Sequence, residues 1–426
     1  MTETDFLFPW HQLAASEAFS ERASLTLGLR SADLHFRELV VPGLGRAWFL
    51  RQLSWPLAAL TLHAQVKAEG ARGRTPTDLA HGIEALACKL EHASGVSSDR
   101  IIGVRAFNRD GGRTWDYEQL RTRAHYVQNT YRQAAVRAIR TESGLGLASG
   151  FRFGSMRLTS VGMELAQAFL AQPAGTGKQT LERWLERWID GQAPSWGTNL
   201  TKALAPTGAS EEEREIVWKR LVGTNDAAGH KRRALAEIFL GESEFPDIER
   251  DLLPELRKRD GAQQSSEIAL ARSFGSVFST ALRVLGLLTR VLERAKSVSP
   301  ADAASLQAIR IASKALREAA SDYRRCHDKL PGAGSADASS FVDQISRCSG
   351  DSTLLEFIVS RDEQVLQLSD GEIHRGPLFR VLDDEESRPE EHDGTTDLDA
   401  RSDSGRTFRL ANLFSLVQDC DMESLP

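Results

Sequence analysis

Apolar residues recur every three or four positions along most of the chain, which is the period of an amphipathic α-helix. The segment from Pro76 to His92 is typical, with its apolar positions on one face. Thr75 and Pro76 provide its start, because a proline at the first helical position loses no hydrogen bond. Similar patterns predict helices over 48–67, 181–188, 210–222, 231–240 and 247–259. We therefore expect a mainly α-helical protein.

The longest regular pattern covers residues 266–296 and has the form of a heptad seam. Its apolar positions are Ala271, Phe274, Phe278, Ala281, Leu285, Leu288 and Leu292. Ser299 and Pro300 then give a new helix start, and a partner helix is predicted over 301–329. The two segments predict an antiparallel helical hairpin about 45 Å long. A bundle core within one chain is favoured over a coiled coil between chains.

The C-terminal region, residues 341–426, is predicted to be a small α/β domain. Strands are expected over 353–359 and 364–368, and an amphipathic helix over 408–418 is expected to dock on this domain. Residues 383–403 hold ten acids against two arginines, which is typical of a disordered, solvated insert. The rival interpretation is that this acidic insert shields a basic surface elsewhere in the chain.

Between residues 100 and 172 the pattern changes several times. Residues 100–107 alternate well enough to predict a short strand, and two helices are predicted over 114–123 and 126–141. The next segment, 143–158, holds four glycines with apolar residues between them, which favours two short strands joined by tight turns. Thr159 is expected to cap a closing helix over 160–171.

This order of elements, together with the segment Met156-Arg-Leu-Thr-Ser-Val-Gly-Met-Glu-Leu-Ala166, resembles the winged-helix module of MarR-like and PadR-like regulators. In these proteins a strand ends in a Leu-Thr pair and a helix with an early glycine follows. The resemblance covers residues 76–172, roughly a quarter of the chain. It implies a winged helix-turn-helix fold and binding to double-stranded DNA.

The charge distribution fits such a module. Residues 100–160 hold eleven arginines and no lysine against four acids, a local net charge of +7 in a chain whose net charge is −6. The candidate DNA-binding residues are Asn129, Arg132, Gln133, Arg137, Arg140, Arg152 and Arg157. The resemblance implies that Arg132, Gln133 and Arg137 read bases. It also implies that Arg140, Arg152 and Arg157 hold the phosphate backbone.

Catalytic and metal-binding motifs are not found in the sequence. The four cysteines are far apart and form no Cys-x-x-Cys pair, and no His-Glu-x-x-His segment occurs, so we expect no metal site and no cofactor. The phosphate-loop-like segment 173–178 lacks the first glycine and the Ser/Thr after Lys178, so it is interpreted as a linker. A weak nuclease alternative rests on acids and a histidine of the C-terminal strands, namely Glu356, Asp362, Glu363, Glu372 and His374.

The whole chain is thus expected to contain four regions: 1–70, the winged-helix module 75–172, a helical domain 178–330 with the long hairpin, and 341–426. No signal peptide and no membrane span are expected, so we predict a cytoplasmic protein. The leading hypothesis is a non-catalytic DNA-binding or assembly subunit of a bacterial DNA-processing or genome-defence complex, which associates with other subunits or with itself. The alternatives are a protein-interaction scaffold without nucleic-acid contact and a nuclease-like enzyme.

Overall fold

The computed structural model describes residues 27–68, 74–95, 98, 100–111, 113, 115–175, 178–192, 196–259, 261–379 and 407–421. These residues are mainly helical, as predicted, and divide into two compact units. Unit 1 contains residues 27–40, 262–379 and 407–408, and unit 2 contains the described residues of 41–261 together with 409–421. The predicted acidic insert, 383–403, and the N-terminal segment 1–26 lie outside the described residues.

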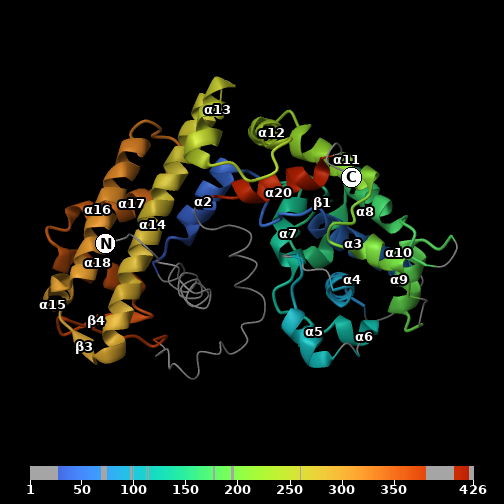
Figure 1. Ribbon diagram of the computed structural model, residues 1–426, viewed down its shortest axis with the longest axis horizontal. Coiled ribbons are helices and arrows are strands. Elements are labelled where there is room, and N and C mark those ends of the chain that lie inside the picture. The colour runs from blue at the N-terminus through green and yellow to red at the C-terminus, as the bar shows by residue number, and fades with distance from the viewer. Residues whose placement is uncertain are drawn as a thin grey trace, which may run out of the picture. The chain divides into compact units, whose positions relative to one another are not determined.

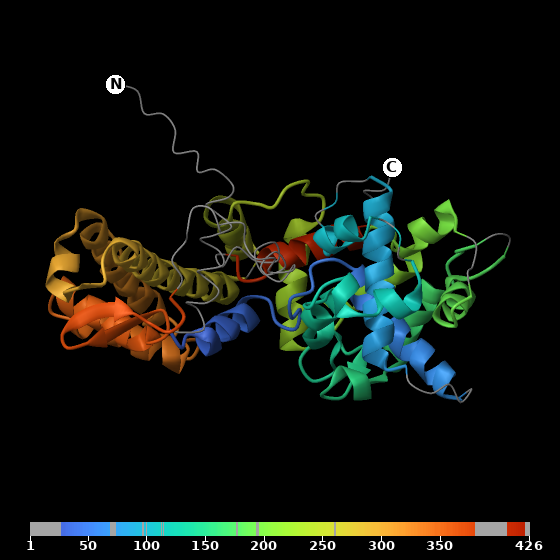
Figure 2. The ribbon, with the colours of Figure 1, turned by 90° about the horizontal axis from the view of Figure 1, so that it is seen from below.

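Unit 1 is built around α14 (Ala262–Arg294), which lies beside α16 (Gln307–His327) in both views (Figures 1 and 2). All residues of the predicted seam are buried except Phe278, which is half-buried. The helical hairpin is therefore confirmed. Its second helix is interrupted, because Ser299 caps the separate short helix α15 (Pro300–Ser305) and α16 begins only after it. The other helices of unit 1 are α2 (Arg30–Val40), α17 (Ala336–Arg347) and α18 (Asp351–Asp362).

A three-stranded antiparallel sheet completes unit 1. Its strand order is β3 (Ser297–Val298), β5 (Glu372–Arg375) and β4 (Leu366–Ser369). The turn between β4 and β5 is tight, since Asp370 and Gly371 both have the positive φ that such a hairpin requires. The strand predicted over 353–359 is wrong, because this segment lies inside α18. There its apolar side chains are buried at helical spacing.

Unit 2 is organised around α3 (Arg51–Ala68), whose residues 51–60 are all buried. Three helices pack against it, namely α4 (Pro76–Ala93), α7 (Tyr131–Ile139) and α8 (Ser160–Leu170). The described part of the predicted first region, residues 27–68, is consequently not separate from the rest of the fold. α2 belongs to unit 1, whereas α3 is the core of the same unit as the predicted winged-helix module. The predicted domain 178–330 is likewise divided between the two units, at residue 261.

The remaining described elements of unit 2 are each shorter than α3 and α4 (Figure 1). They are α5 (Val104–Asp110), α6 (Tyr117–Leu120), η1 (Arg123–His125), β1 (Ala148–Ser149), η2 (Phe153–Ser155), β2 (Arg157–Leu158), α9 (Leu181–Ile189), α10 (Thr198–Leu204), α11 (Glu211–Val222), α12 (Ala227–Phe239), η3 (Ile248–Leu252), α13 (Leu253–Lys258) and α20 (Leu410–Cys420).

Two predictions in unit 2 are corrected by the structure. The strand predicted over 100–107 is absent, because Gly103 adopts a left-handed conformation (φ 82°) and the chain turns there into α5. The C-terminal amphipathic helix does form, as α20, but it packs on α11 and α12 of unit 2 and not on a small C-terminal domain.

Among the described helices, α14 is the one long and apolar enough to cross a membrane. Half of its most apolar window is buried inside the protein. Core helices of soluble proteins meet the same criterion of length and composition.

Candidate nucleic-acid interface

Helix α7 is anchored in the interior of unit 2 by a buried carboxylate. Glu84 of α4 accepts hydrogen bonds from the backbone N–H groups of Tyr131 (2.7 Å) and Arg132 (3.0 Å), which begin α7, and from the Tyr126 hydroxyl (3.0 Å). A carboxylate at this position satisfies the N–H groups that a helix start leaves unpaired. Burial raises the pKa of Glu84 to about 7, against the hydrogen bonds that lower it.

The outward face of α7 is largely covered, which differs from the open recognition face that the sequence predicts. Gln133 is the one exposed side chain of this helix, and its Oε1 atom accepts a hydrogen bond from the Thr130 backbone N–H as part of a capping box. The loop before α3 packs along the helix, since the Arg46 N–H donates to the Ala134 carbonyl (3.0 Å). Gly45 lies so close that an added Cβ would be 3.1 Å from the Arg137 Cβ.

Two further candidate residues, one in the turn before α7 and one in the first turn of the helix, are half-buried. Asn129 is half-buried in the turn that precedes it. The Arg132 guanidinium lies 5.1 Å from the centre of the Phe153 ring, and burial lowers its pKa, a shift that the nearby Glu84 opposes. This geometry favours a packing role for Arg132 over base reading.

The segment after α7 forms the small antiparallel hairpin that the glycine-rich pattern predicts. β1 pairs with β2 through Ala148 and Leu158 and through Ser149 and Arg157. Thr159 then caps α8 by accepting a hydrogen bond from the Gly162 N–H (3.1 Å), while its hydroxyl donates to the Gly146 carbonyl (2.9 Å). The hairpin and α8 are therefore held together at their junction.

The tip of this hairpin presents an exposed aromatic ring among arginines. Phe151 is 83% exposed, although burying such a side chain would contribute roughly 2 kcal/mol. Arg152, the next residue, and Arg157 of β2 are also exposed. Arg140, which follows α7, places its guanidinium 4.4 Å from the centre of the Phe151 ring and lies 3.6 Å from the Glu142 carboxylate. We call Phe151, Arg140, Arg152 and Arg157 the hairpin-tip cluster.

The positive charge of residues 100–160 is partly neutralised inside the fold. Arg100 forms an ion pair with Asp419 (2.7 Å), and Arg121 pairs with Glu118 (2.8 Å). Asp419 is distant in the sequence, so a local count of charges does not include it. The arginines that remain exposed include those of the hairpin tip.

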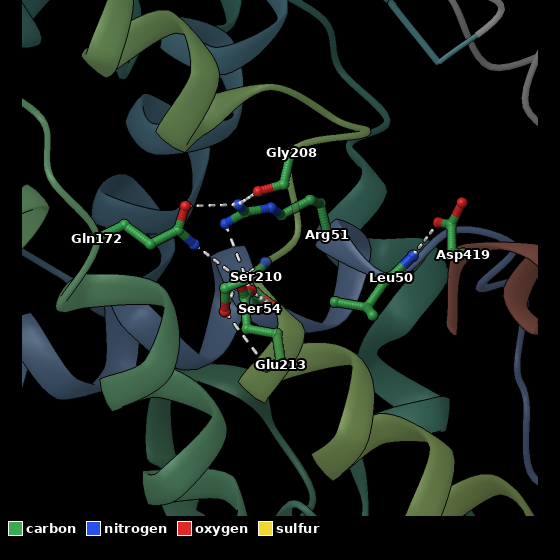
Figure 3. Close-up of polar contacts among 8 residues, drawn as sticks. All are labelled: Leu50, Arg51, Ser54, Gln172, Gly208, Ser210, Glu213 and Asp419. Atoms are coloured by element: carbon green, nitrogen blue, oxygen red, sulfur yellow. Dashed lines mark hydrogen bonds and ion pairs between the residues drawn. The ribbon is translucent and has the colours of Figure 1, made fainter. Parts of the chain in front are cut away.

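A second polar group in unit 2 is centred on two fully buried side chains, Arg51 and Glu213 (Figure 3). The Arg51 guanidinium donates to the Gly208 carbonyl and to Gln172, and lies 3.4 Å from the Glu213 carboxylate. Glu213 also accepts from Ser54 (2.6 Å) and Gln172 (2.7 Å), and burial lowers the pKa of Arg51. These contacts join α3 to α11 and to the end of α8, which identifies the group as a structural link within the core.

The residues of the nuclease alternative do not form a metal site. Among the described residues, no group of three or more His, Cys, Asp or Glu is able to hold a metal ion. Asp362 is buried and accepts hydrogen bonds from the N–H groups of Val365 and Leu366, so it closes the turn between α18 and β4.

No family model matches the chain, and neither the curated proteins nor the solved structures contain one that is detectably similar to it. The resemblance to winged-helix regulators consequently receives no support from relatives.

Sequence reasoning did not single out Phe151. Its context, Gly150-Phe-Arg-Phe-Gly154, carried a signal: two glycines bracket two aromatic residues beside an arginine. A strand would place Phe151 and Phe153 on one face. The short helix η2 begins at Phe153 instead, and Phe153 is buried whereas Phe151 is exposed.

Proposed function

We propose that the chain is a non-catalytic DNA-binding subunit of a larger assembly, whose unit 2 contacts the phosphate backbone of double-stranded DNA through the β1–β2 hairpin. The observation that carries the proposal is the hairpin-tip cluster. Residues 143–163 contain Arg152 and Arg157, both exposed, and no carboxylate. Arginine at an exposed loop tip is well suited to phosphate oxygens.

The order of α4, α7, the β1–β2 hairpin and α8 supports a module of winged-helix type, with the hairpin as its wing. Within this proposal α7 has a different part from the one expected of a recognition helix. Arg132 of α7 packs on Phe153, and Arg140, which follows α7, packs on Phe151. The helix therefore supports the hairpin through these two contacts.

The test is binding of a fluorescently labelled DNA duplex, measured by anisotropy over a series of salt concentrations. The double variant Arg152→Ala/Arg157→Ala is expected to bind more weakly and to reduce the salt slope by about two, because two phosphate contacts are lost. Arg183→Ala/Arg187→Ala, which removes two exposed arginines of α9 in the same unit, is the charge-matched control. An unchanged affinity and slope in the Arg152→Ala/Arg157→Ala variant would rule out the hairpin as the DNA contact.

The second candidate function is a protein-interaction scaffold, favoured by the exposure of Phe151. An aromatic side chain flanked by arginines also suits the centre of a protein interface. The salt series separates the two functions, since a scaffold would show no affinity for the duplex in the wild-type protein.

A further inference from the structure

The Phe151 ring has one covered face and one open face. The Arg140 guanidinium lies 4.4 Å from the ring centre, which is cation–π distance, and so occupies one face. The side chain nevertheless remains 83% exposed, so the opposite face is available to a second planar group. Contact with Arg140 fixes the orientation of the ring before any ligand arrives, which reduces the entropy lost on binding.

The charges of the hairpin indicate which kind of planar group would bind to the open face of Phe151. Arg152 and Arg157 are exposed in the same hairpin, and Glu142, which lies beside Arg140, is the nearest acid before this hairpin in the sequence. A nucleobase is planar and is attached to phosphates, so it satisfies both the open aromatic face and the exposed guanidiniums of the same hairpin. An apolar protein side chain would cover the aromatic face but would leave the guanidiniums without an anion.

A base within a duplex cannot use the open face of Phe151. Its own faces are covered by the neighbouring base pairs, and only its edges are accessible in the grooves. An unpaired base has an uncovered face, and stacking on an aromatic side chain is the general way in which proteins hold single strands.

We propose that Phe151 is a stacking platform for an unpaired nucleobase, and that the DNA recognised by unit 2 therefore has a single-stranded segment adjoining its duplex. This inference rests on the DNA-binding function proposed above and specifies the class of DNA. Arg152 and Arg157 hold the backbone, and the open face of Phe151 takes the first unpaired base.

The experiment compares two labelled probes with the full chain: a blunt duplex, and the same duplex with a single-stranded thymidine tail that carries 2-aminopurine at its first unpaired position. Wild type is expected to bind the tailed probe about tenfold more tightly than the blunt one, and to quench the 2-aminopurine fluorescence by stacking. Phe151→Ala should lose both the preference and the quenching, so that it binds the two probes with equal affinity, whereas Phe151→Trp should retain both.

Leu240→Ala is the control, because Leu240 is an exposed apolar residue of unit 2 (40% exposed) outside the hairpin. Since the side chain of Phe151 is in solvent, its variants are expected to fold, and circular dichroism checks this. A tail preference that persists in Phe151→Ala, or an equal loss for both probes, overturns the stacking role.

The arginine variants keep the two proposals distinguishable. If Arg152→Ala/Arg157→Ala weakens duplex binding while Phe151→Ala changes nothing, only the stacking platform is refuted. If neither probe binds the wild-type protein, the DNA-binding function fails as well, and contact with a protein becomes the remaining use of the exposed ring.

Discussion

Two buried ionisable residues of α4 have pKa values that move in opposite directions. Burial raises the pKa of Glu84 to about 7 and lowers the pKa of His81 to about 4. Both face the region where α7 begins. His81 contacts the Tyr126 ring (5.3 Å between centroids), and the charge of Arg132 also lowers its pKa. The stability of unit 2 therefore depends on the protonation of two neighbouring groups whose effects have opposite signs.

We predict opposite pH profiles when these residues are replaced. The raised pKa of Glu84 contributes stability that is present below its ordinary pKa of 4.5 and is lost as pH rises through about 7. The lowered pKa of His81 contributes stability that is present above 6.5 and is lost as pH falls towards about 4. Relative to wild type, Glu84→Gln should therefore lose stability on acidification and His81→Gln should gain it, each by roughly 1–3 kcal/mol. Denaturant titrations across this pH range provide the measurement, and parallel profiles for all three proteins would contradict the prediction.

The buried Arg51–Glu213 pair gives a second prediction at this scale. Arg51→Met leaves the Glu213 carboxylate buried without its cation, and unit 2 is expected to lose about 3–5 kcal/mol. Adding Glu213→Gln removes the unpaired charge and keeps oxygen and nitrogen atoms for Ser54 and Gln172, so the double variant should recover much of the loss. Chemical denaturation of the four proteins in the cycle measures the coupling. Additive effects of the two substitutions would mean that the pair is not coupled.

At the scale of elements, the junction between the β1–β2 hairpin and α8 depends on a glycine. A Cβ on Gly162 would lie 1.8 Å from the Leu147 carbonyl oxygen, which is backbone and cannot move independently. We therefore expect Gly162→Ala to separate α8 from the hairpin and to cost about 1–3 kcal/mol or more. Gly154→Ala is the matched control, because its added Cβ would meet nothing within 4 Å. Thermal unfolding that is equally affected in both variants would refute the role of this close approach.

The elements that the sequence predicted correctly are those whose signals are local. Thr75 and Pro76 define the start of α4, and the seam of α14 repeats over many turns. The elements that were wrong depend on contacts that are remote in the sequence. Residues 353–359 have strand composition, but burial on one face of α18 makes them helical. The candidate site was likewise predicted only in part, because nothing near α7 in the sequence reveals that the loop containing Gly45 covers it.

At the scale of the whole molecule, the described part of the chain passes between the two units at residues 40/41, 261/262 and 408/409. The last passage brings α20 into unit 2, where Asp419 accepts a hydrogen bond from the Leu50 N–H (2.9 Å) and pairs with Arg100. Residues near the two ends of unit 2 are thus joined through a buried carboxylate. Unit 1 has its own core around Phe274, which contacts Phe36 and Tyr323. Each unit has the internal packing of an independently cooperative domain.

We therefore expect the two units to unfold in separate transitions that respond to different substitutions. Asp419→Ala leaves Arg100 without its carboxylate and should lower the transition of unit 2, by an amount that corresponds to about 3–5 kcal/mol. Phe274→Ala creates a cavity in the core of unit 1 and should lower the other transition by a similar amount. Differential scanning calorimetry of wild type and both variants measures these shifts. A single transition, lowered by either substitution, would show that the chain unfolds as one cooperative block, because a two-state protein transmits every local loss of stability to the whole.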